Sequence, residues 1–264
     1  MSVRSNGSGD QLVATASLGL STGQFRLAGW FKLISDQNNF GGFAGFGSEN
    51  MDATTKVLVG VDSTGTALGA FATSGQHSGG TVALTVGVWY WIVMSRSTTN
   101  DWIIRVFDDS TSTTPIGTLT GADLTDDFTT ADNLIIGQLV TGEWGDFETC
   151  NVKLVIGGSD WTDAECRTES QLFEIQALKG GSAYCSARLE NTDADTDGLN
   201  DGSGAGHNLS NTGFVNGASR PSQLESIASV VLTGTVTPST TEADIVAGGE
   251  TIVLTVSGDT YIPN

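Results

Sequence analysis

The sequence is poor in basic residues, histidine, proline and cysteine. Its 264 residues include 11 Lys and Arg against 30 Asp and Glu, giving a formal net charge of −19, with 2 His, 4 Pro and 3 Cys. Such a chain repels phosphate backbones and anionic lipid, so we expect no nucleic-acid partner. The longest apolar run, 88–94, is far shorter than the ~20 residues that span a bilayer, so we expect no membrane insertion.

The cysteines and the first residues bear on where the chain folds. Cys150, Cys166 and Cys185 are widely separated and form no Cys-x-x-Cys pair, which argues against a zinc site and a disulfide framework. A single disulfide stays open. The first ten residues contain no apolar stretch of the kind found in a secretory signal. We therefore expect folding in a reducing cytoplasm, whatever the final place of work.

What the sequence does contain is alternation of apolar and polar residues, punctuated by Gly, Asn, Asp and Ser. In 25–33 the residues Phe25, Leu27, Phe31 and Leu33 fall on one face of a strand. In 147–156, Cys150 is expected on the same side as Val152, Leu154 and Ile156. The same reasoning predicts further strands at 56–62, 81–86, 88–96, 102–107 and 134–138. The pattern predicts an all-β, antiparallel sandwich.

One short helix and a C-terminal extension complete the expected organisation. Residues 159–177 read as the helix, capped by Ser159 or Thr162. A composition shift near Arg220 divides a main domain, 1–220, from an extension, 221–264, with strands predicted at 229–236 and 251–256. Two strands alone are marginally stable in water. The extension therefore adds strands to the sandwich, pairs with another chain, or is the stub of a longer protein.

Four ordered segments resemble the laminin-G-like, concanavalin A-like jelly-roll superfamily. They are 5–12 with 25–31, then 89–96 with 104–108, then 134–137, and finally 145–156 with 161–165. Together they span roughly 3–177, and the resemblance implies a jelly-roll β-sandwich with a short helix. Residues 183–210 are similar to the start of such domains but follow the helix. This placement predicts a permuted strand, an idea that fails if the segment is detached from both sheets.

The superfamily includes enzymes, whose motifs are incomplete here. Laminarinase-like hydrolases place two carboxylates on one strand face, whereas Glu143 and Glu148 are five apart and Gly145 stands where an Asp is needed. Alginate-lyase-like members carry Arg-Thr-Glu on a strand, whereas Arg167-Thr-Glu lies in the expected helix. We therefore expect a protein that is not an enzyme.

Non-catalytic jelly rolls bind glycans or proteins through loop residues, with aromatic faces on sugar rings and carboxylates on hydroxyls. Trp144 with Glu143 and Asp146 is the first candidate ligand site, and plain packing of Trp144 is the alternative. Trp102 and Trp161 are further candidates. For the other three tryptophans we expect packing in the core or on a sheet surface: Trp30, Trp89 and Trp91.

An acidic loop is the candidate metal site. Asp193, Asp195, Asp197 and Asp201 occupy positions 1, 3, 5 and 9 of the loop, with Gly198 at position 6. This spacing is similar to the calcium loops of thrombospondin-type-3-like repeats and predicts a structural calcium ion. A solvated acidic turn is the alternative.

Laminin-G-like domains mostly act outside cells, yet this sequence shows no secretory signal in its first residues. Virion proteins of tailed bacteriophages fold in the host cytoplasm and leave by lysis, which reconciles the two facts. We expect a capsid decoration, head fibre or tail-fibre module with an adhesive, glycan-binding surface, whose partners are other virion proteins or further copies bound through the C-terminal strands. The alternatives are an extracellular bacterial carbohydrate-binding module and a glycoside hydrolase of the same superfamily.

Overall fold

The computed structural model describes residues 2–6, 9–15, 24–36, 41–47, 56–72, 75–96, 101–121, 133–137, 145–192, 199–224, 254–256 and 259–261. The chain separates into two units, Met1–Ala228 and Ser229–Asn264. The expected boundary was Arg220, but the described residues up to Leu224 still pack on the first unit. No helix of the described residues is long and apolar enough to cross a membrane.

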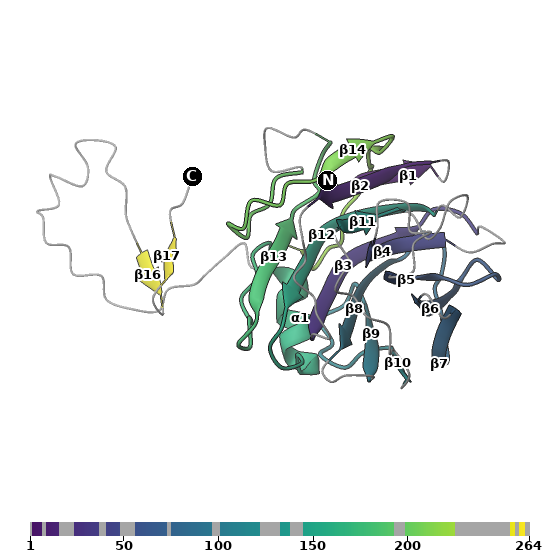
Figure 1. The fold of residues 1–264 in the computed structure, drawn as a ribbon, viewed down its shortest axis with the longest axis horizontal. Helices are drawn as coiled ribbons and strands as arrows, with labels where there is room; N and C mark the ends of the chain where they lie inside the picture. Colours follow the sequence, from purple (N-terminus) through teal and green to yellow (C-terminus); the bar gives the residue numbers. More distant parts are fainter. Residues whose placement is uncertain are drawn as a thin grey trace, which may run out of the picture. The chain divides into compact units, whose positions relative to one another are not determined.

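The first unit is a sandwich of two antiparallel sheets (Figure 1), as the alternation predicts. The first sheet has the order β10-β9-β8-β3-β12-β1-β15, with β13 also paired to β12. Its strands are β1 (Val3–Asn6), β3 (Phe25–Leu33), β8 (Trp89–Arg96), β9 (Trp102–Asp108), β10 (Gly117–Gly121), β12 (Asp146–Ile156), β13 (Ser182–Ala187) and β15 (Val215–Asn216).

The second sheet has the order β14-β2-β11-β4-β5-β6-β7. Its strands are β2 (Gln11–Thr15), β4 (Gly41–Gly47), β5 (Lys56–Val61), β6 (Ala67–Ala72), β7 (Gly75–Ala83), β11 (Asn133–Ile136) and β14 (Ser210–Thr212). The alternation did not predict the glycine-rich β4. The neighbouring β5 approaches β4 closely at Gly60, because a Cβ on Gly60 would lie 2.3 Å from the carbonyl oxygen of Gly41. Glycine is therefore required at position 60.

The core lies between the two sheets and is rich in aromatic rings. Phe31 of β3 stacks on Phe43 of β4, with ring centroids 5.1 Å apart, and Phe147 of β12 meets Phe43 edge-on at 5.3 Å. Offset and edge-on ring pairs add stability beyond the burial of their area. Because these rings come from both sheets, they fix the face that β3 and β12 turn inward.

The opposite face of β3 is also buried, which the alternation in 25–33 did not predict. The helix α1 (Asp163–Gln171) lies against β3 and β12 (Figure 1). Trp30 of β3 donates a hydrogen bond of 2.8 Å from Nε1 to the carbonyl oxygen of Ser170, and Trp30 and Trp91 pack with centroids 5.7 Å apart. The expected packing role of Trp30, Trp89 and Trp91 is confirmed, since all three are buried.

The helix is shorter than the predicted 159–177. Thr162 caps its N-terminus in a capping box with Glu165, as one of the two expected caps. The helix ends at Gln171, since Leu172 adopts an extended conformation (φ −110°, ψ 146°) and its carbonyl oxygen accepts a hydrogen bond of 2.8 Å from Asn151 Nδ2. Further along, Glu169 Oε1 accepts hydrogen bonds from the backbone amides of Gln176 and Ala177, at 2.7 and 2.6 Å.

A β-bulge in β12 overturns the expectation for Cys150. The register pairs Cys150 with Trp30 and Leu154 with Leu27, and shifts between them at Asn151, which has a φ of 51°. Directly opposite residues share a face in an antiparallel pair, so Cys150 lies on the Trp30 face, away from Leu154. A bulge inserts one residue and reverses the alternation beyond it.

Residues after the helix complete both sheets. β13 pairs with β12, β14 pairs with β2, and β15 pairs with β1. The segment 183–210 is therefore attached to both sheets, and the permutation hypothesis stands. Beyond β15, residues 217–224 cross the first sheet on the side where the helix lies. The amide of Gly217 donates to the carbonyl oxygen of Ser2, and the amides of Ser222 and Gln223 donate to the carboxylate of Asp109.

The second unit contains one described pair of strands. β16 (Leu254–Val256) and β17 (Asp259–Tyr261) pair antiparallel, with Leu254 opposite Tyr261. β16 lies within the predicted 251–256, whereas the predicted strand 229–236 lies outside the described residues.

Candidate functional site

The first predicted ligand site is only partly described. Glu143 and Trp144 lie outside the described residues. Asp146 begins β12, and its carboxylate accepts a hydrogen bond from Ser35 Oγ at 2.9 Å and pairs with Arg4 Nη2 at 3.3 Å. These contacts tie Asp146 to its own chain, and the three-residue site itself stays a prediction.

Three of the four predicted calcium ligands, Asp193, Asp195 and Asp197, also lie outside the described residues. Asp201 is described. Its Oδ1 accepts hydrogen bonds from the backbone amides of Ser186 and Ser203, both at 2.8 Å. Its Oδ2 accepts from Ser203 Oγ at 2.8 Å and from the amide of His207 at 3.0 Å.

These four hydrogen bonds favour the charged form of Asp201 and fix the loop around it. Burial alone would raise the pKa of this carboxyl, but the hydrogen bonds from Ser203, Ser186 and His207 outweigh burial and lower it. A carboxylate offers about four lone-pair positions, and here each one has a protein donor. Asp201 therefore fits a loop anchor better than an ion ligand. In the described part of the chain, no three His, Cys, Asp or Glu side chains are grouped to hold a metal.

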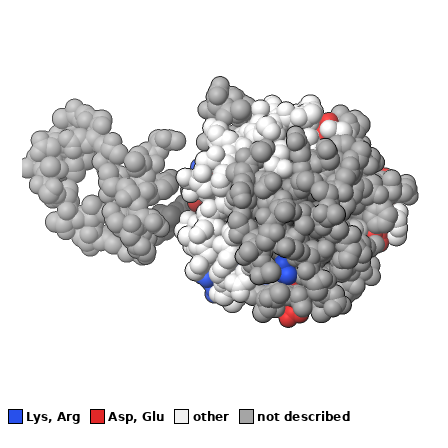
Figure 2. All heavy atoms as spheres, in the orientation of Figure 1, with Lys and Arg blue, Asp and Glu red and all other residues white. Residues whose placement is uncertain are grey.

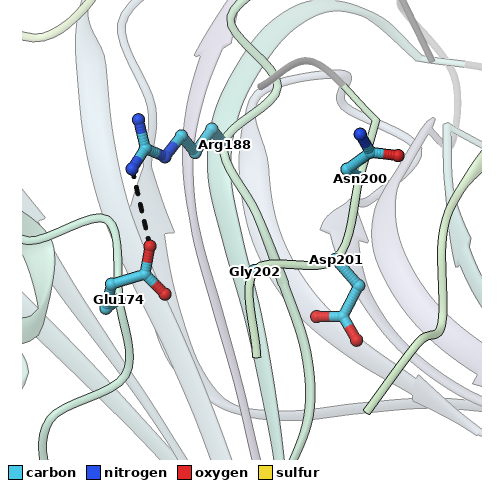
Figure 3. A pocket seen from close by; sticks show the side chains of 5 residues that line it. All are labelled: Glu174, Arg188, Asn200, Asp201 and Gly202. Atoms are coloured by element: carbon cyan, nitrogen blue, oxygen red, sulfur yellow. Dashed lines mark ion pairs between the residues drawn. The ribbon is translucent and has the colours of Figure 1, made fainter. Parts of the chain in front are cut away.

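A small hollow lies beside this anchor (Figure 3), and we call it the Asp201 hollow. It has a volume of about 180 Å³ and is lined by Glu174, Arg188, Asn200, Asp201 and Gly202. The amide of Gly202 bonds to the carbonyl oxygen of Ser186 at 2.8 Å, which ties this wall to β13. The hollow therefore stands on the edge of the first sheet.

An open ion pair forms the opposite wall of the hollow. Arg188 Nη2 lies 3.6 Å from Glu174 Oε1, and the two side chains are 36% and 47% exposed. The Arg188 guanidinium lies over the ring of Phe173, 4.6 Å from its centroid. A Cβ added at Gly202 would lie 3.2 Å from Glu174 Oε2, so the glycine leaves the space in front of this carboxylate open.

Two aromatic rings stand on the other side of Asp201. Tyr184 and His207 stack with centroids 3.9 Å apart and an interplanar angle of 30°. His207 Nδ1 lies 2.7 Å from the carbonyl oxygen of Tyr184. The stack is held by the backbone on both sides, and it leaves the half-buried imidazole at the surface beside the Asp201 loop.

Trp102 and Trp161, the further aromatic candidates, are wrong as ligand platforms. They are 2% and 1% exposed. Trp161 donates a hydrogen bond from Nε1 to the carbonyl oxygen of Ala177 at 2.6 Å, and Arg26 lies over its ring. Trp161 is covered by the segment that follows the helix. Trp102 lies opposite Arg96, which lies opposite Phe25, so Trp102 is on the face of the first sheet that points into the core.

The acidic and basic residues of the enzyme comparison are embedded in the fold. Glu148 is 3% exposed and pairs with Lys32 at 2.7 Å, beneath Ser219, whose Oγ bonds to it at 3.0 Å. Burial would raise the pKa of Glu148, but bonds from Lys32, Ala218 and Ser219 outweigh burial and lower it. Arg167 and Glu169 lie in α1, as expected, and are buried there.

The sequence did not single out Glu174, Arg188 or Asn200. No motif links them, because they are brought together only by the pairing of β13 with β12 and by the return of the chain at Asp201. The single sequence signal was Asp201 itself, at the end of the acidic loop. On the face shown in Figure 2, charged atoms of the described surface lie at scattered points, without one large patch of either sign.

Comparison with known proteins identifies the fold. No protein-family model matches the chain, and no curated protein matches it in sequence. A solved structure from Bacteroides ovatus, named as a candidate carbohydrate-binding protein, matches with a TM-score of 0.53 and 11% identity over 83% of this chain. The chain spans 61% of the length of that structure. At this identity the match supports the β-sandwich fold alone.

Two further similar structures match less well. One is a heptameric pentraxin from Limulus polyphemus, with a TM-score of 0.38, 15% identity, and coverage of 60% of this chain and 81% of the pentraxin. The other is tailspike protein 2 of an Escherichia coli O157:H7 bacteriophage, with a TM-score of 0.47, 12% identity, and coverage of 69% and 26%. These two matches add nothing to the fold assignment; the two antiparallel sheets and the Bacteroides ovatus match show a jelly-roll β-sandwich with one short helix, as predicted.

Proposed function

We propose that this chain is a non-enzymatic, glycan-binding β-sandwich that is displayed on a virion surface as a capsid decoration, head fibre or tail-fibre module. The observation that carries glycan binding is the Asp201 hollow, where a carboxylate, a guanidinium and an amide line one open space on a rigid sheet edge. The match to a candidate carbohydrate-binding sandwich supports the same ligand class.

The polar groups that line the hollow are of the kinds that form hydrogen bonds with sugars. A carboxylate accepts hydrogen bonds from two hydroxyls, while a guanidinium and an amide donate to hydroxyl and ring oxygens. In the hollow, Glu174 supplies the acceptor and Arg188 the donor, and the lining also includes Asn200. The half-exposed His207 ring, stacked on Tyr184, adds a flat surface nearby for a second sugar.

The absence of catalysis is part of the proposal, and the position of Glu148 supports it. A glycosidase needs two carboxyl groups that reach the bond being cleaved. Glu148 is instead paired with Lys32 and covered by Ser219. A carboxyl with a lowered pKa is also poorly suited to donate a proton as a general acid.

Display on a virion is supported by the sequence. The net charge of −19 favours the solubility of a protein that is displayed in many copies. The C-terminal strands β16 and β17 form a two-stranded pair, which is marginally stable alone. We propose that this unit binds further copies or other virion proteins.

A second candidate function is an extracellular bacterial carbohydrate-binding module. The similarity to the Bacteroides ovatus structure over 83% of this chain favours it. Solution mass separates the two: a virion module is oligomeric through its C-terminal unit, whereas a secreted module is a monomer.

A glycan array tests the shared claim. The full chain should bind a defined subset of glycans, and reducing-sugar release from those glycans should stay at the buffer level. Release that disappears in Glu143→Gln or Glu148→Gln would overturn the non-enzymatic part, and an array without any bound glycan would overturn the binding part.

A further inference from the structure

The charges of the Asp201 hollow restrict which glycans it can hold. Three charged side chains line it, two acidic and one basic: Glu174, Asp201 and Arg188. The hollow therefore carries one net negative charge in a protein of net charge −19. An acidic sugar would meet both the local and the long-range repulsion.

Asp201 forms one wall of the hollow, but its oxygens are already bonded within the protein. Its two oxygens accept four hydrogen bonds from Ser186, Ser203 and His207. A sugar hydroxyl could bind Asp201 only by displacing one of these donors, of which three are backbone amides: one from β13 and two from the loop. The opposite wall of the hollow is formed by Glu174 and Arg188, whose side chains are partly exposed.

That wall is a loose acid–base pair. Glu174 and Arg188 are 3.6 Å apart and about 36–47% exposed, so their mutual attraction is weak and screened by water. Neighbouring hydroxyls of a sugar can donate to Glu174 while their oxygens accept from Arg188, which satisfies both groups without separating opposite charges. A sugar carboxylate would have to take Arg188 from Glu174 and leave that acid unpaired.

We infer that the Asp201 hollow binds one ring of an uncharged sugar through two neighbouring hydroxyls, with Glu174 as acceptor and Arg188 as donor. This inference rests on the proposed glycan-binding function and adds the ligand class and the residues. A volume of about 180 Å³ is below the ~300 Å³ at which sites for larger small molecules begin, so a single ring fits.

The test compares methyl glycosides of neutral hexoses with the methyl glycoside of glucuronic acid, by ligand-observed NMR and calorimetry on the full chain. The neutral sugar should bind, and the uronic acid should bind at least about tenfold more weakly. Glu174→Gln should weaken the neutral sugar by about tenfold or more, because a hydrogen bond to a charged acceptor is replaced by one to an amide. Gly202→Ala should do the same by placing a methyl group 3.2 Å from Glu174 Oε2.

Glu190→Gln is the matched control. Glu190 also faces an arginine at 3.6 Å, in the pair with Arg220, but does not line the hollow. It should leave binding unchanged. Stronger binding of the uronic acid would overturn the ligand class while glycan binding stands. Neutral-sugar binding that survives both Glu174→Gln and Gly202→Ala would overturn the site, and no binding of any sugar here or on the array would overturn the proposed function as well.

Discussion

Two ion pairs near the segment that follows α1 differ in burial: Lys153–Glu169 is enclosed in the fold, and Arg188–Glu174 is open to solvent. Lys153 and Glu169 lie 2.8 Å apart with side chains that are 0% and 1% exposed. Arg188 and Glu174 lie 3.6 Å apart and are about a third to a half exposed. The polar atoms of the first pair are bonded within the fold, whereas the second pair is open to solvent.

The buried pair also positions the open one. Lys153 Nζ donates to the carbonyl oxygens of Glu169 and Glu174, at 2.9 and 2.8 Å, as well as to Glu169 Oε2. Burial lowers the pKa of Lys153, and the charge of Glu169 acts in the opposite direction. The backbone of Glu174 is thus fixed from within, while its side chain stands in the hollow.

The largest expected effect comes from breaking the buried pair. Lys153→Met leaves Glu169 buried without its cation, which should lower the free energy of unfolding by about 3–5 kcal/mol. Chemical denaturation measures this loss. The double variant Lys153→Met, Glu169→Met removes both charges and should recover much of it. A loss below about 1 kcal/mol in the single variant would show that the pair does not hold the helix.

A melting experiment with calcium tests whether the acidic loop 193–201 binds the ion that its spacing predicts. If Asp193, Asp195 and Asp197 bind calcium, an ion at 100 times its dissociation constant should stabilise the protein by about 2.7 kcal/mol. The melting temperature with calcium is compared with that in chelator. Magnesium at equal concentration is the control for ionic strength. Equal melting in calcium and chelator would leave the acidic turn as solvated loop and exclude the ion.

The Glu148–Lys32 pair should make the covered face sensitive to acid. The pKa of Glu148 is lowered in the folded protein, so its stabilising contribution is complete above the pKa of about 4.3 of an unfolded Glu and is lost as pH falls through the folded value. Glu148→Gln should cost about 1–3 kcal/mol at pH 7 and flatten the stability profile below pH 4.5. Urea midpoints from pH 7 to pH 3 check both. A variant that keeps the full acid-side slope would contradict the assignment.

The smallest effect on stability is expected at the open pair. Glu174→Gln should change the free energy of unfolding by less than about 0.5 kcal/mol, because half-exposed pairs contribute little. Thermal unfolding compares it with Glu190→Gln. A loss above 1 kcal/mol would place Glu174 among the structural residues and remove the contrast between the two pairs.

The sequence predicted the sandwich because strands with one inward face obey period two. It did not predict that 25–33 is covered on both faces, since α1 reaches Trp30 from far along the chain. Nor did it predict the side of Cys150, which depends on the bulge at Asn151. Local pattern carries neither the docking of a helix nor an inserted residue.

The hollow was beyond sequence reasoning for a similar reason. Glu174, Arg188 and Asn200 meet only through strand pairing and a returning loop, and each is an ordinary surface residue in the sequence. Asp201 was singled out, but as a calcium ligand, because spacing along a chain does not reveal that Ser186, Ser203 and His207 fill its oxygens.

One calorimetric titration tests the central claim most directly: the neutral methyl hexoside that binds the full chain, measured on Glu174→Gln and on Glu190→Gln under the same conditions. The account predicts binding about tenfold or more weaker for Glu174→Gln and unchanged for Glu190→Gln, with both variants melting as the unaltered protein does. Equal affinity of the two variants for the sugar would contradict it.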